Sequence, residues 1–256
     1  MEIKGKKAVV FGGASGMGRA SAELLAARGA EVAVLDRPES DGAEVAAACG
    51  GTFHPVDVTD FEGTERALAD AVTQLGGVHV AVTTAGGGVA RRTLGKQGPH
   101  DLATFRRILD LNAVATFNIS RLAAAHMSRN APEDPDVTGE RGVIVNTASI
   151  AAFEGQIGQV AYGAAKAAIA GMCLTMARDL GSLGIRVMAI APSLFETGAV
   201  RKISDEVKSA LVQDAAFPKR LGHPEEYAKL VLAIIDNPML NGQCLRLDAG
   251  QRFGPR

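Results

Sequence analysis

The pattern that most limits the possible folds of this chain is a regular alternation of short apolar runs with longer segments of helical spacing. The runs that we expect to form strands are Ala8–Phe11, Glu31–Leu35, Gly51–Pro55, Val78–Val82, Val143–Asn146, Arg186–Ile190 and Cys244–Leu247. The segments that we expect to form helices are Gly18–Arg28, Asp60–Leu75, Leu102–Ser128, Gln159–Leu180, Asp205–Val212 and Pro224–Asp236. Several runs are apolar throughout, as strands covered on both faces are. The alternation predicts an α/β fold, a Rossmann-type doubly wound parallel sheet flanked by helices on both faces.

Two stretches interrupt this pattern, residues 86–99 and residues 130–142. Both are rich in glycine, proline and charge, so we expect surface loops there. The alternation resumes after each, which predicts that residues 1–256 form a single domain.

Composition argues against several classes of protein. The 256 residues carry a net charge of -1, which gives no general attraction to nucleic acid or to anionic lipid. The chain has no Trp and only two Tyr, so few side chains could stack on bases. We find no signal-peptide core and no run apolar and long enough to span a bilayer. The expectation is a soluble, cytoplasmic protein with neither a nucleic-acid nor a membrane partner.

Cysteine and histidine usage points to no metal site. The three cysteines, Cys49, Cys173 and Cys244, are far apart and include no CxxC pair, which is typical of reduced thiols. None of the five histidines has HExxH spacing or a cysteine close in the sequence.

A glycine-rich turn follows the first expected strand. Its glycines Gly12, Gly16 and Gly18 have the spacing GxxxGxG and lead into the first expected helix. Glycine lets the backbone approach a pyrophosphate closely, and a helix N-terminus offers unpaired N–H groups with partial positive charge. Tight turns use glycine in any case, but the position in the first strand–helix unit of an alternating chain favours dinucleotide binding.

Asp36 ends the second expected strand, eighteen residues after Gly18. A carboxylate there can accept hydrogen bonds from both hydroxyls of an adenosine ribose, and it repels a 2′-phosphate. At ~4 Å and an effective dielectric of ~20, each unit of like charge costs up to about 4 kcal/mol. Asp36 therefore favours NAD over NADP, although the guanidinium of Arg37 offsets part of the repulsion. The alternative is an ordinary solvated turn acid before Pro38.

Two more short segments follow strands at the same edge of the sheet. After the third strand, the Asp57 carboxylate could accept from an adenine amino group while Val58 packs on the ring; helix N-capping, together with Asp60, is the simpler role. Thr84, Ala85 and Gly86 form a small-residue loop after the fourth strand, where open sheets bind ligands.

Three polar side chains between residues 149 and 166 suit proton transfer. Tyr162 and Lys166 are four residues apart, so on a helix they share one face. A free phenol has a pKa near ~10, and a base for neutral pH needs roughly three units less, or about 4 kcal/mol. An ammonium ~4 Å away supplies an energy of that size. Ser149 follows an apolar run and can bind the same substrate oxygen. Alone, this spacing is a weak signal, since a surface tyrosine and a solvated lysine also fit it.

Taken together and in this order, the motifs resemble the short-chain dehydrogenase/reductase family over nearly all of the chain. They are GGASGMG (12–18), Asp36, Asp57-Val58, Thr84-Ala85-Gly86, Asn112, Ser149, the YxxxK pair at 162–166, the segment after Pro192 and residues 241–248. Within the family, segments 146–162, 184–197 and 217–231 are most similar to the 3-hydroxyacyl-CoA dehydrogenase type 2 group. The departures from the family pattern are Phe11, Thr83-Thr84, Ser193 and Glu196.

The resemblance implies a role for each matching residue. Tyr162 would transfer the proton, with Lys166 lowering its pKa and holding the nicotinamide ribose. Ser149 would bind the substrate oxygen, and Asn112 would anchor a water relay to Lys166, unless it only hydrogen-bonds within its own helix. Cofactor contacts would fall on Gly12, Ser15, Gly16, Met17, Gly18, Asp36, Asp57, Val58, Thr84, Ala85, Gly86, Tyr162, Lys166, Phe195 and Thr197. Substrate contacts would fall on Ser149, Gln156, Gln159 and Tyr162, under a lid at 194–200.

The implied activity is the NAD-dependent interconversion of a secondary alcohol and a ketone, with 3-hydroxyacyl-CoA as the favoured substrate. Arg91, Arg92 and Lys96 could attract the phosphates of coenzyme A, although a charged loop is more often only solvated. The enzymatic alternatives are a hydroxysteroid dehydrogenase and a 3-oxoacyl-carrier reductase; the non-enzymatic one is a dinucleotide-binding scaffold protein. The helices expected at 102–128 and 159–180 resemble the pair that assembles the family's homotetramers.

Overall fold

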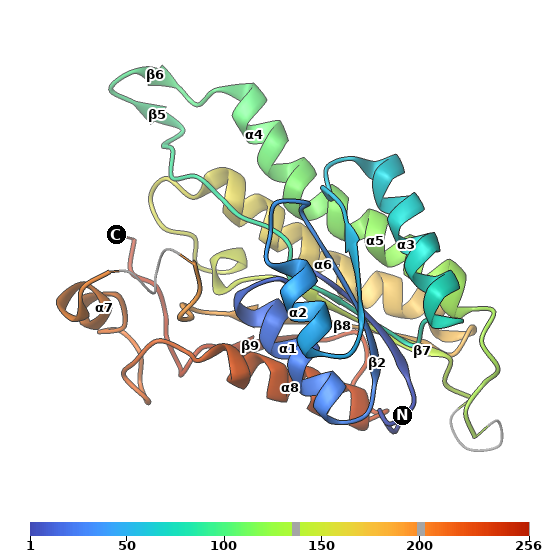
Figure 1. The fold of residues 1–256 in the computed structure, drawn as a ribbon. Helices are drawn as coiled ribbons and strands as arrows, with labels where there is room; N and C mark the ends of the chain where they lie inside the picture. The colour runs from blue at the N-terminus through green and yellow to red at the C-terminus, as the bar shows by residue number, and fades with distance from the viewer. Residues whose placement is uncertain (135–138, 199–202, 256) are drawn as a thin grey trace.

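Seven parallel strands form the central sheet, in the order β3-β2-β1-β4-β7-β8-β9 (Figure 1). The computed structural model describes residues 1–134, 139–198 and 203–255. The strands of the sheet are β1 (Lys7–Phe11), β2 (Glu31–Asp36), β3 (Thr52–Pro55), β4 (Val80–Thr83), β7 (Gly142–Thr147), β8 (Ile185–Pro192) and β9 (Cys244–Leu247). The order runs outward in opposite directions from β1 and β4, and open sheets bind dinucleotides at such a switch point.

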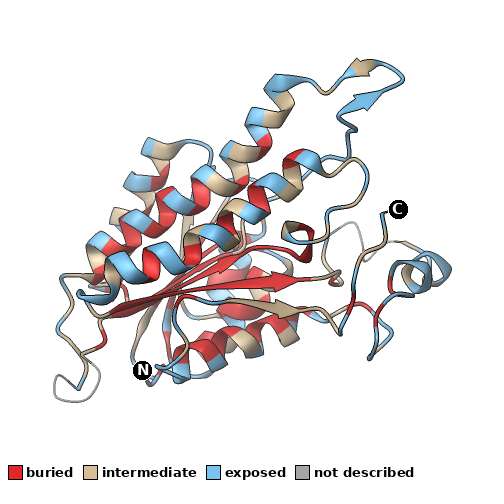
Figure 2. Cartoon of the chain, turned by 180° about the vertical axis from the view of Figure 1, so that it is seen from behind, coloured by how far each residue is buried: buried red, intermediate tan, exposed pale blue. Residues whose placement is uncertain are grey.

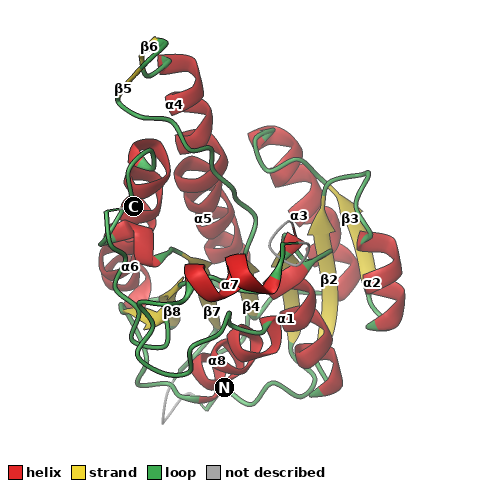
Figure 3. Cartoon of the chain, turned by 90° about the vertical axis from the view of Figure 1, so that its left-hand side faces the viewer, coloured by secondary structure: helices red, strands yellow, loops and turns green. Residues whose placement is uncertain are grey.

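The helices lie on both faces of this sheet (Figures 1 and 2). They are α1 (Gly16–Ala27), α2 (Gly42–Ala48), α3 (Phe61–Leu75), α4 (Leu102–Leu109), α5 (Ala115–Met127), α6 (Val160–Gly181), α7 (Asp205–Leu211) and α8 (Pro224–Asp236), with a π-helical turn η1 (Asp110–Val114) and a 3₁₀ turn η2 (Ile150–Ala152). Figure 3 shows α7 in front of the sheet, over β4 and β7.

Two apolar layers hold the helices on the sheet. Because successive strand residues point to opposite faces, Val9 and Phe11 of β1 pack in the layer that contains α3, α5 and α6. Ala8 and Val10 pack in the other layer, with α1, α2 and α8. Both faces of β1 are therefore buried from Ala8 onward, which explains why its last four residues are all apolar.

The structure confirms the Rossmann-type doubly wound sheet and corrects three local expectations. The segment 86–99 is more than a loop, because it carries an antiparallel pair, β5 (Leu94–Gly95) and β6 (Gly98–Pro99). The helix expected at 102–128 is divided by η1 into α4 and α5. Helix α2 was not expected, because its seven residues, mostly alanine, are too few to show a helical period.

Helix α6 corrects a fourth expectation, that no segment could span a bilayer. Its 22 residues reach a mean hydropathy of 1.4 over an 18-residue window, so by length and composition alone it could cross a membrane. A core helix passes the same test, and Ile169 and Cys173 of α6 are buried in the apolar layer against the sheet.

Candidate active site

Ser149, Tyr162 and Lys166 meet where β7 ends and α6 begins. Ser149 lies two residues after β7, at the N-cap of η2, and is 8% exposed. Tyr162 and Lys166 lie in the first two turns of α6. The Lys166 Nζ is buried, donates to the carbonyl oxygen of Thr147 at 2.8 Å and lies 5.7 Å from the centroid of the Tyr162 ring. The structure therefore brings all three predicted proton-transfer residues together.

Burial dominates the electrostatics of this cluster. Burial lowers the pKa of Lys166 to about 8 because the ammonium loses hydration. Burial also raises the pKa of Tyr162, while a hydrogen bond with Ser149 acts in the opposite direction. The Coulomb energy estimated from the sequence left out this cost of desolvating a phenolate, which the Lys166 ammonium has to offset.

Asn112 is held by the wide turn η1, in which it is fully buried. Its Nδ2 donates to the carbonyl oxygens of Gly87 at 2.8 Å and Ile108 at 2.9 Å, and its Oδ1 accepts from the Gly87 N–H at 3.1 Å. A Cβ on Gly86 would lie 2.6 Å from the Asn112 Oδ1 and 3.4 Å from the Lys166 Nζ, so Gly86 lies beside both groups. The local hydrogen bond considered for Asn112 is present, and so is the proximity to Lys166 that a relay requires.

The glycine turn leaves no room for side chains. A Cβ on Gly12, where φ is +77°, would lie 2.6 Å from the Ala85 N. On Gly18 it would lie 2.0 Å from the Gly12 carbonyl oxygen, and on Gly16, where φ is +51°, it would lie 2.7 Å from the Thr197 Cγ2. The turn thus packs directly against Ala85 and Thr197, which belong to two other segments predicted to contact the cofactor. It also exposes the first turn of α1, where Ser15 occupies the N-cap position.

Asp36 lies at the carboxyl end of β2, beside this turn. Its Oδ2 accepts from the Ala14 N–H at 2.9 Å, and its Oδ1 accepts from the Arg37 N–H at 2.8 Å. These bonds fix the carboxylate next to the glycine turn. The Arg37 guanidinium contacts Glu39 at 3.1 Å. A glycine cradle, an open helix N-terminus and a fixed acid together fit a dinucleotide.

Other predicted cofactor residues mainly support the site. Thr84 donates from Oγ1 to the carbonyl oxygens of Phe11 and Gly12, both at 3.1 Å, and so ties β4 to the glycine turn. The Asp57 Oδ1 accepts from the N–H and the hydroxyl of Thr59 in the turn before α3, which lowers the Asp57 pKa. The N-cap of α3 is Asp60, whose side chain accepts from the Gly63 N–H. Val58 and Phe195 are buried in the two apolar layers, and Met17 is partly buried against the layer that contains Phe195.

The structure shows the contacts of two residues that depart from the family pattern, Glu196 and Thr83. Glu196 faces His223 at 3.5 Å, and its N–H donates to the Gly222 carbonyl oxygen, which holds the segment after β8 against the start of α8. The Thr83 Oγ1 is buried without a hydrogen-bond partner among the described residues. Of the expected lid, residues 199 and 200 lie outside the described residues.

A cavity of about 650 Å³ lies over η2, the loop that follows it and the start of α6. Its lining consists of Arg92, Thr93, Leu94, Ala151, Ala152, Phe153, Gly155, Gln156, Ile157, Gly158, Gln159, Val160, Gly163, Ala164, Ala167 and Pro255. The predicted substrate residues Gln156 and Gln159 line it, whereas Ser149 and Tyr162 do not. The Gln159 Oε1 accepts from the Gln156 N–H at 3.0 Å, so this amide also shapes its own loop.

Sequence reasoning missed two supporting residues. A Cβ on Gly88 would lie 2.8 Å from the Tyr162 Cδ2, so only glycine fits against this ring. The Thr147 carbonyl oxygen holds the Lys166 Nζ. The run of three glycines at 86–88 was a visible signal for Gly88, whereas a backbone carbonyl has none in the sequence.

Known proteins match both this sequence and this structure. Residues 6–208 match the short chain dehydrogenase family. The chain is 49% identical over 257 residues to 3-hydroxyacyl-CoA dehydrogenase type-2 of Homo sapiens, covering 99% of this chain and 97% of the human one. With the Drosophila melanogaster protein of that name, it is 47% identical over 99% and 100% of the two chains. The crystal structure of 3-hydroxyacyl-CoA dehydrogenase type-2 from Mycobacterium avium matches all of both chains with a TM-score of 0.93 and 39% identity. The chain therefore belongs to the short-chain dehydrogenase family, whose enzymes are oxidoreductases that use a nicotinamide dinucleotide.

Proposed function

We propose that this enzyme is an NAD-dependent 3-hydroxyacyl-CoA dehydrogenase. The observation that carries the proposal is the near-complete match, at close to half identity, to relatives with that name. The cluster of Ser149, Tyr162 and Lys166 beside the glycine turn supports it, because an alcohol oxidation needs these groups next to a dinucleotide.

Each residue of the cluster has one task in the oxidative direction. Ser149 hydrogen-bonds the oxygen of the substrate alcohol, and ionised Tyr162 takes the proton from that oxygen. When bound, NAD supplies the hydride acceptor. Lys166, with a pKa of about 8, is mostly protonated at pH 7 and stabilises the phenolate that burial disfavours. Asn112 keeps its amide oriented beside Lys166.

Tyr162→Phe tests the assignment directly. The variant removes only the hydroxyl, so NAD should bind with an unchanged Kd while kcat falls at least about a thousandfold, within the range of general acid–base catalysis. NADH absorbance measures turnover and NADH fluorescence measures binding. A variant that keeps near-wild-type kcat contradicts the role of the phenol, and a wild type active only on other alcohols contradicts the substrate.

The choice of NAD rests on Asp36. Both of its carboxylate oxygens are held by backbone N–H groups, and the neighbouring Arg37 is engaged by Glu39. Arg37 is then less able to offset the repulsion of a 2′-phosphate. Asp36→Ala should reduce the ratio of NADPH to NADH dissociation constants about a hundredfold, since one like charge at ~4 Å costs up to about 4 kcal/mol. An unchanged ratio contradicts this choice.

Arg91, Arg92 and Lys96 are proposed to attract the coenzyme A phosphates. All three are exposed, and Arg92 lines the cavity. The Arg91 N–H donates to the Gly158 carbonyl oxygen at 2.7 Å, which joins their segment to residues 150–159, here called the substrate loop. Changing all three to Gln should raise the KM for an acyl-CoA about tenfold and leave that for a small ketone unchanged. The exposed pair Arg106 and Arg107 of α4, changed to Gln, is the control. Equal effects on both substrates contradict the idea.

A homotetramer is proposed from the outer faces of α5 and α6. Phe117 and Leu183 are 46% and 41% exposed, and both line a cavity of about 320 Å³ between α5 and the end of α6. Exposed apolar side chains gathered on one face favour association. Phe117→Asp combined with Leu183→Asp should halve the mass measured by light scattering; an unchanged mass contradicts this interface.

A further inference from the structure

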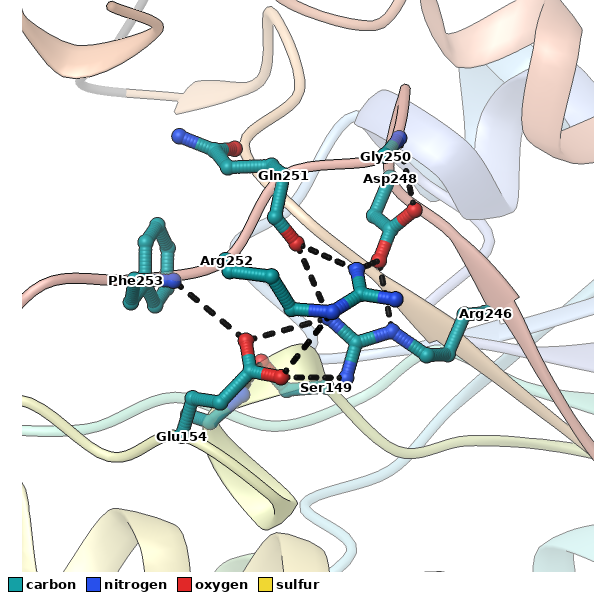
Figure 4. A network of polar contacts seen from close by, with 9 residues as sticks. Ser149, Glu154, Arg246, Asp248, Gly250, Gln251, Arg252 and Phe253 are labelled. Carbon is teal, nitrogen blue, oxygen red and sulfur yellow. Dashed lines mark hydrogen bonds and ion pairs between the residues drawn. The ribbon is translucent and has the colours of Figure 1, made fainter. Parts of the chain in front are cut away.

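Four charged side chains form a compact network that joins the substrate loop to β9 and the residues after it (Figure 4). We call Glu154, Arg246, Asp248 and Arg252 the quartet. The Arg246 guanidinium donates from Nη1 and Nη2 to the two oxygens of Glu154, at 2.8 and 3.1 Å, and from Nε to the Asp248 Oδ2 at 2.6 Å. Arg252 contacts Glu154 at 3.5 Å and Asp248 at 3.1 Å. Two parallel bonds from one guanidinium to one carboxylate fix both position and orientation.

The quartet is not built to attract an anion. It contains two acids and two bases, so its formal charge is zero. All three nitrogens of Arg246 donate within the protein, because Nη2 also bonds the Gln251 carbonyl oxygen at 2.9 Å. The Arg246 and Glu154 side chains are only 22% and 24% exposed. Because these charges are paired within the protein, the quartet is suited to fixing the backbone segments that carry it and not to binding a ligand.

The quartet joins a rigid element to the loop that connects the catalytic residues. Glu154 lies within the segment that separates Ser149 from Tyr162. Arg246 lies in β9, in register with Ala191 of β8, so its backbone is fixed by the sheet. The Arg246 guanidinium also lies 5.5 Å from the centroid of the Phe153 ring, which lines the cavity over η2 and the start of α6.

The chain after β9 extends this connection to the substrate loop and to α7. The Phe253 N–H donates to Glu154 at 3.3 Å, and the Ile157 N–H donates to the Pro255 carbonyl oxygen at 3.0 Å. On the other side, the Gln251 Nε2 donates to the Leu211 carbonyl oxygen of α7 at 2.8 Å. One segment, 248–255, therefore contacts both the substrate loop and the end of α7.

We propose that Arg246 is a positioning residue of the dehydrogenase: through its paired bonds to Glu154 it fixes the loop 150–159, and so sets the placement of Ser149 and the shape of the cavity that this loop lines. The proposal rests on the proposed roles of Ser149 and Tyr162, and it holds for whichever alcohol the enzyme oxidises. The Arg246 hydrogen bond keeps the pKa of Glu154 below its ordinary value, so the pair stays charged at neutral pH.

A double-mutant cycle on the pair tests the proposal. Glu154→Gln, Arg246→Gln and the double variant are compared by kcat and KM, by NADH binding and by thermal unfolding. Each single variant should lower kcat/KM about tenfold, because small misplacements at a reacting centre are costly. The double variant should also lose about tenfold instead of about a hundredfold, since the pair acts as one unit. The NADH Kd should stay within about twofold of wild type, because the glycine turn is untouched.

Two further variants separate positioning from plain stability. Arg246→Lys keeps the charge but cannot form two parallel bonds to one carboxylate, so it should fold normally and still lose most of the kcat/KM. The pair Glu62 and Arg66 of α3, each changed to Gln, is the matched control, since these side chains are 91% and 68% exposed and contact each other at 3.8 Å. Full activity of Arg246→Lys, or independent effects in the cycle, would overturn the proposal.

The outcomes also separate this proposal from the proposed function. A wild type inactive on 3-hydroxyacyl-CoA but active on another alcohol overturns only the substrate assignment, and the cycle is then measured with that alcohol. A normal Tyr162→Phe variant overturns the assigned chemistry, whatever the cycle shows.

Discussion

At the residue scale, this active site shows burial and charge acting against each other. Lys166 and Tyr162 lie on α6 next to the end of β7, where neither an ammonium nor a phenolate is well hydrated. From the four-residue spacing alone, we expected the ammonium to stabilise the phenolate. The structure adds a desolvation cost for both, so the site is poised for proton transfer at the expense of stability.

Replacing Lys166 by Met should therefore stabilise the fold while abolishing activity. The folded-state pKa of about 8 lies below the ordinary 10.5, so the unfolded chain binds more protons between these values. Below pH 8 the buried ammonium therefore lowers the free energy of unfolding of the wild type by its full amount, roughly 3 kcal/mol. The wild type regains this stability as the pH rises from 8 to 10.5. Allowing about 1 kcal/mol for the lost bond to Thr147, the variant should gain about 2 kcal/mol at pH 7.

Urea unfolding at pH 7 and pH 10 measures this effect. The gain should shrink markedly at pH 10, where the amine is neutral in the folded state and no longer carries a buried charge. A variant less stable than wild type at pH 7 contradicts the buried-ammonium penalty.

Gly88→Ala should misplace the phenol of Tyr162. The new Cβ would lie 2.8 Å from the Tyr162 Cδ2, so the ring must move. We expect kcat to fall tenfold or more, which corresponds to about 1.4 kcal/mol of barrier, with little change in NADH binding. Gly87→Ala is the control, because its Cβ meets nothing closer than the Leu111 Cδ2 at 3.9 Å. If the two variants behave alike, the contact with Tyr162 is not what matters.

At the element scale, two short departures from regular structure shape the site. The wide turn η1 between α4 and α5 holds Asn112, and η2 after β7 holds Ser149. Helical periodicity predicted one helix through 102–128, because inserting one residue into a turn leaves the apolar pattern nearly intact. The pairs β5–β6 and the short α2 were missed because two-residue strands and seven-residue helices carry too few side chains to show a period.

Gly18→Ala should damage the start of α1. Its Cβ would lie 2.0 Å from the Gly12 carbonyl oxygen, so the turn must open. We expect the free energy of unfolding to fall by about 2 kcal/mol, as for other overpacked sites, and NADH binding to weaken at least tenfold. Gly181→Ala at the end of α6, where a Cβ meets nothing within 4 Å, should be neutral or slightly stabilising. Urea unfolding and NADH fluorescence compare the two; equal stability contradicts the tight turn.

At the scale of the whole molecule, one buried ion pair links distant parts of the chain. Arg186 of β8 contacts Glu140 at 2.7 Å, and both side chains are less than a tenth exposed. The same guanidinium donates to the carbonyl oxygens of Ile234 and Ile235 near the end of α8. It therefore joins the sheet to a helix of the covering layer, away from the catalytic edge.

Glu140→Gln should destabilise the fold without changing the chemistry. Removing one partner leaves a buried guanidinium without its counter-charge, which costs about 3 kcal/mol or more. Glu23→Gln, in the exposed pair with Arg19, should cost less than about 0.5 kcal/mol. Urea unfolding measures both, and kcat of Glu140→Gln measured below its unfolding transition should match wild type. Equal losses in the two variants would show that burial does not set the strength of the Arg186 pair.

The sequence by itself determined the sheet, its covering helices, the glycine turn, Asp36 and the trio of Ser149, Tyr162 and Lys166. These features follow from side-chain period, backbone freedom and residue chemistry, which act over a few residues and are visible in a string of letters. Only the tertiary structure decided the direction of the Tyr162 pKa shift, the packing of Gly88 on its ring and the pairing of Glu154 with Arg246. Those depend on which groups lose water and on which distant segments meet, and both are set only when the chain is packed.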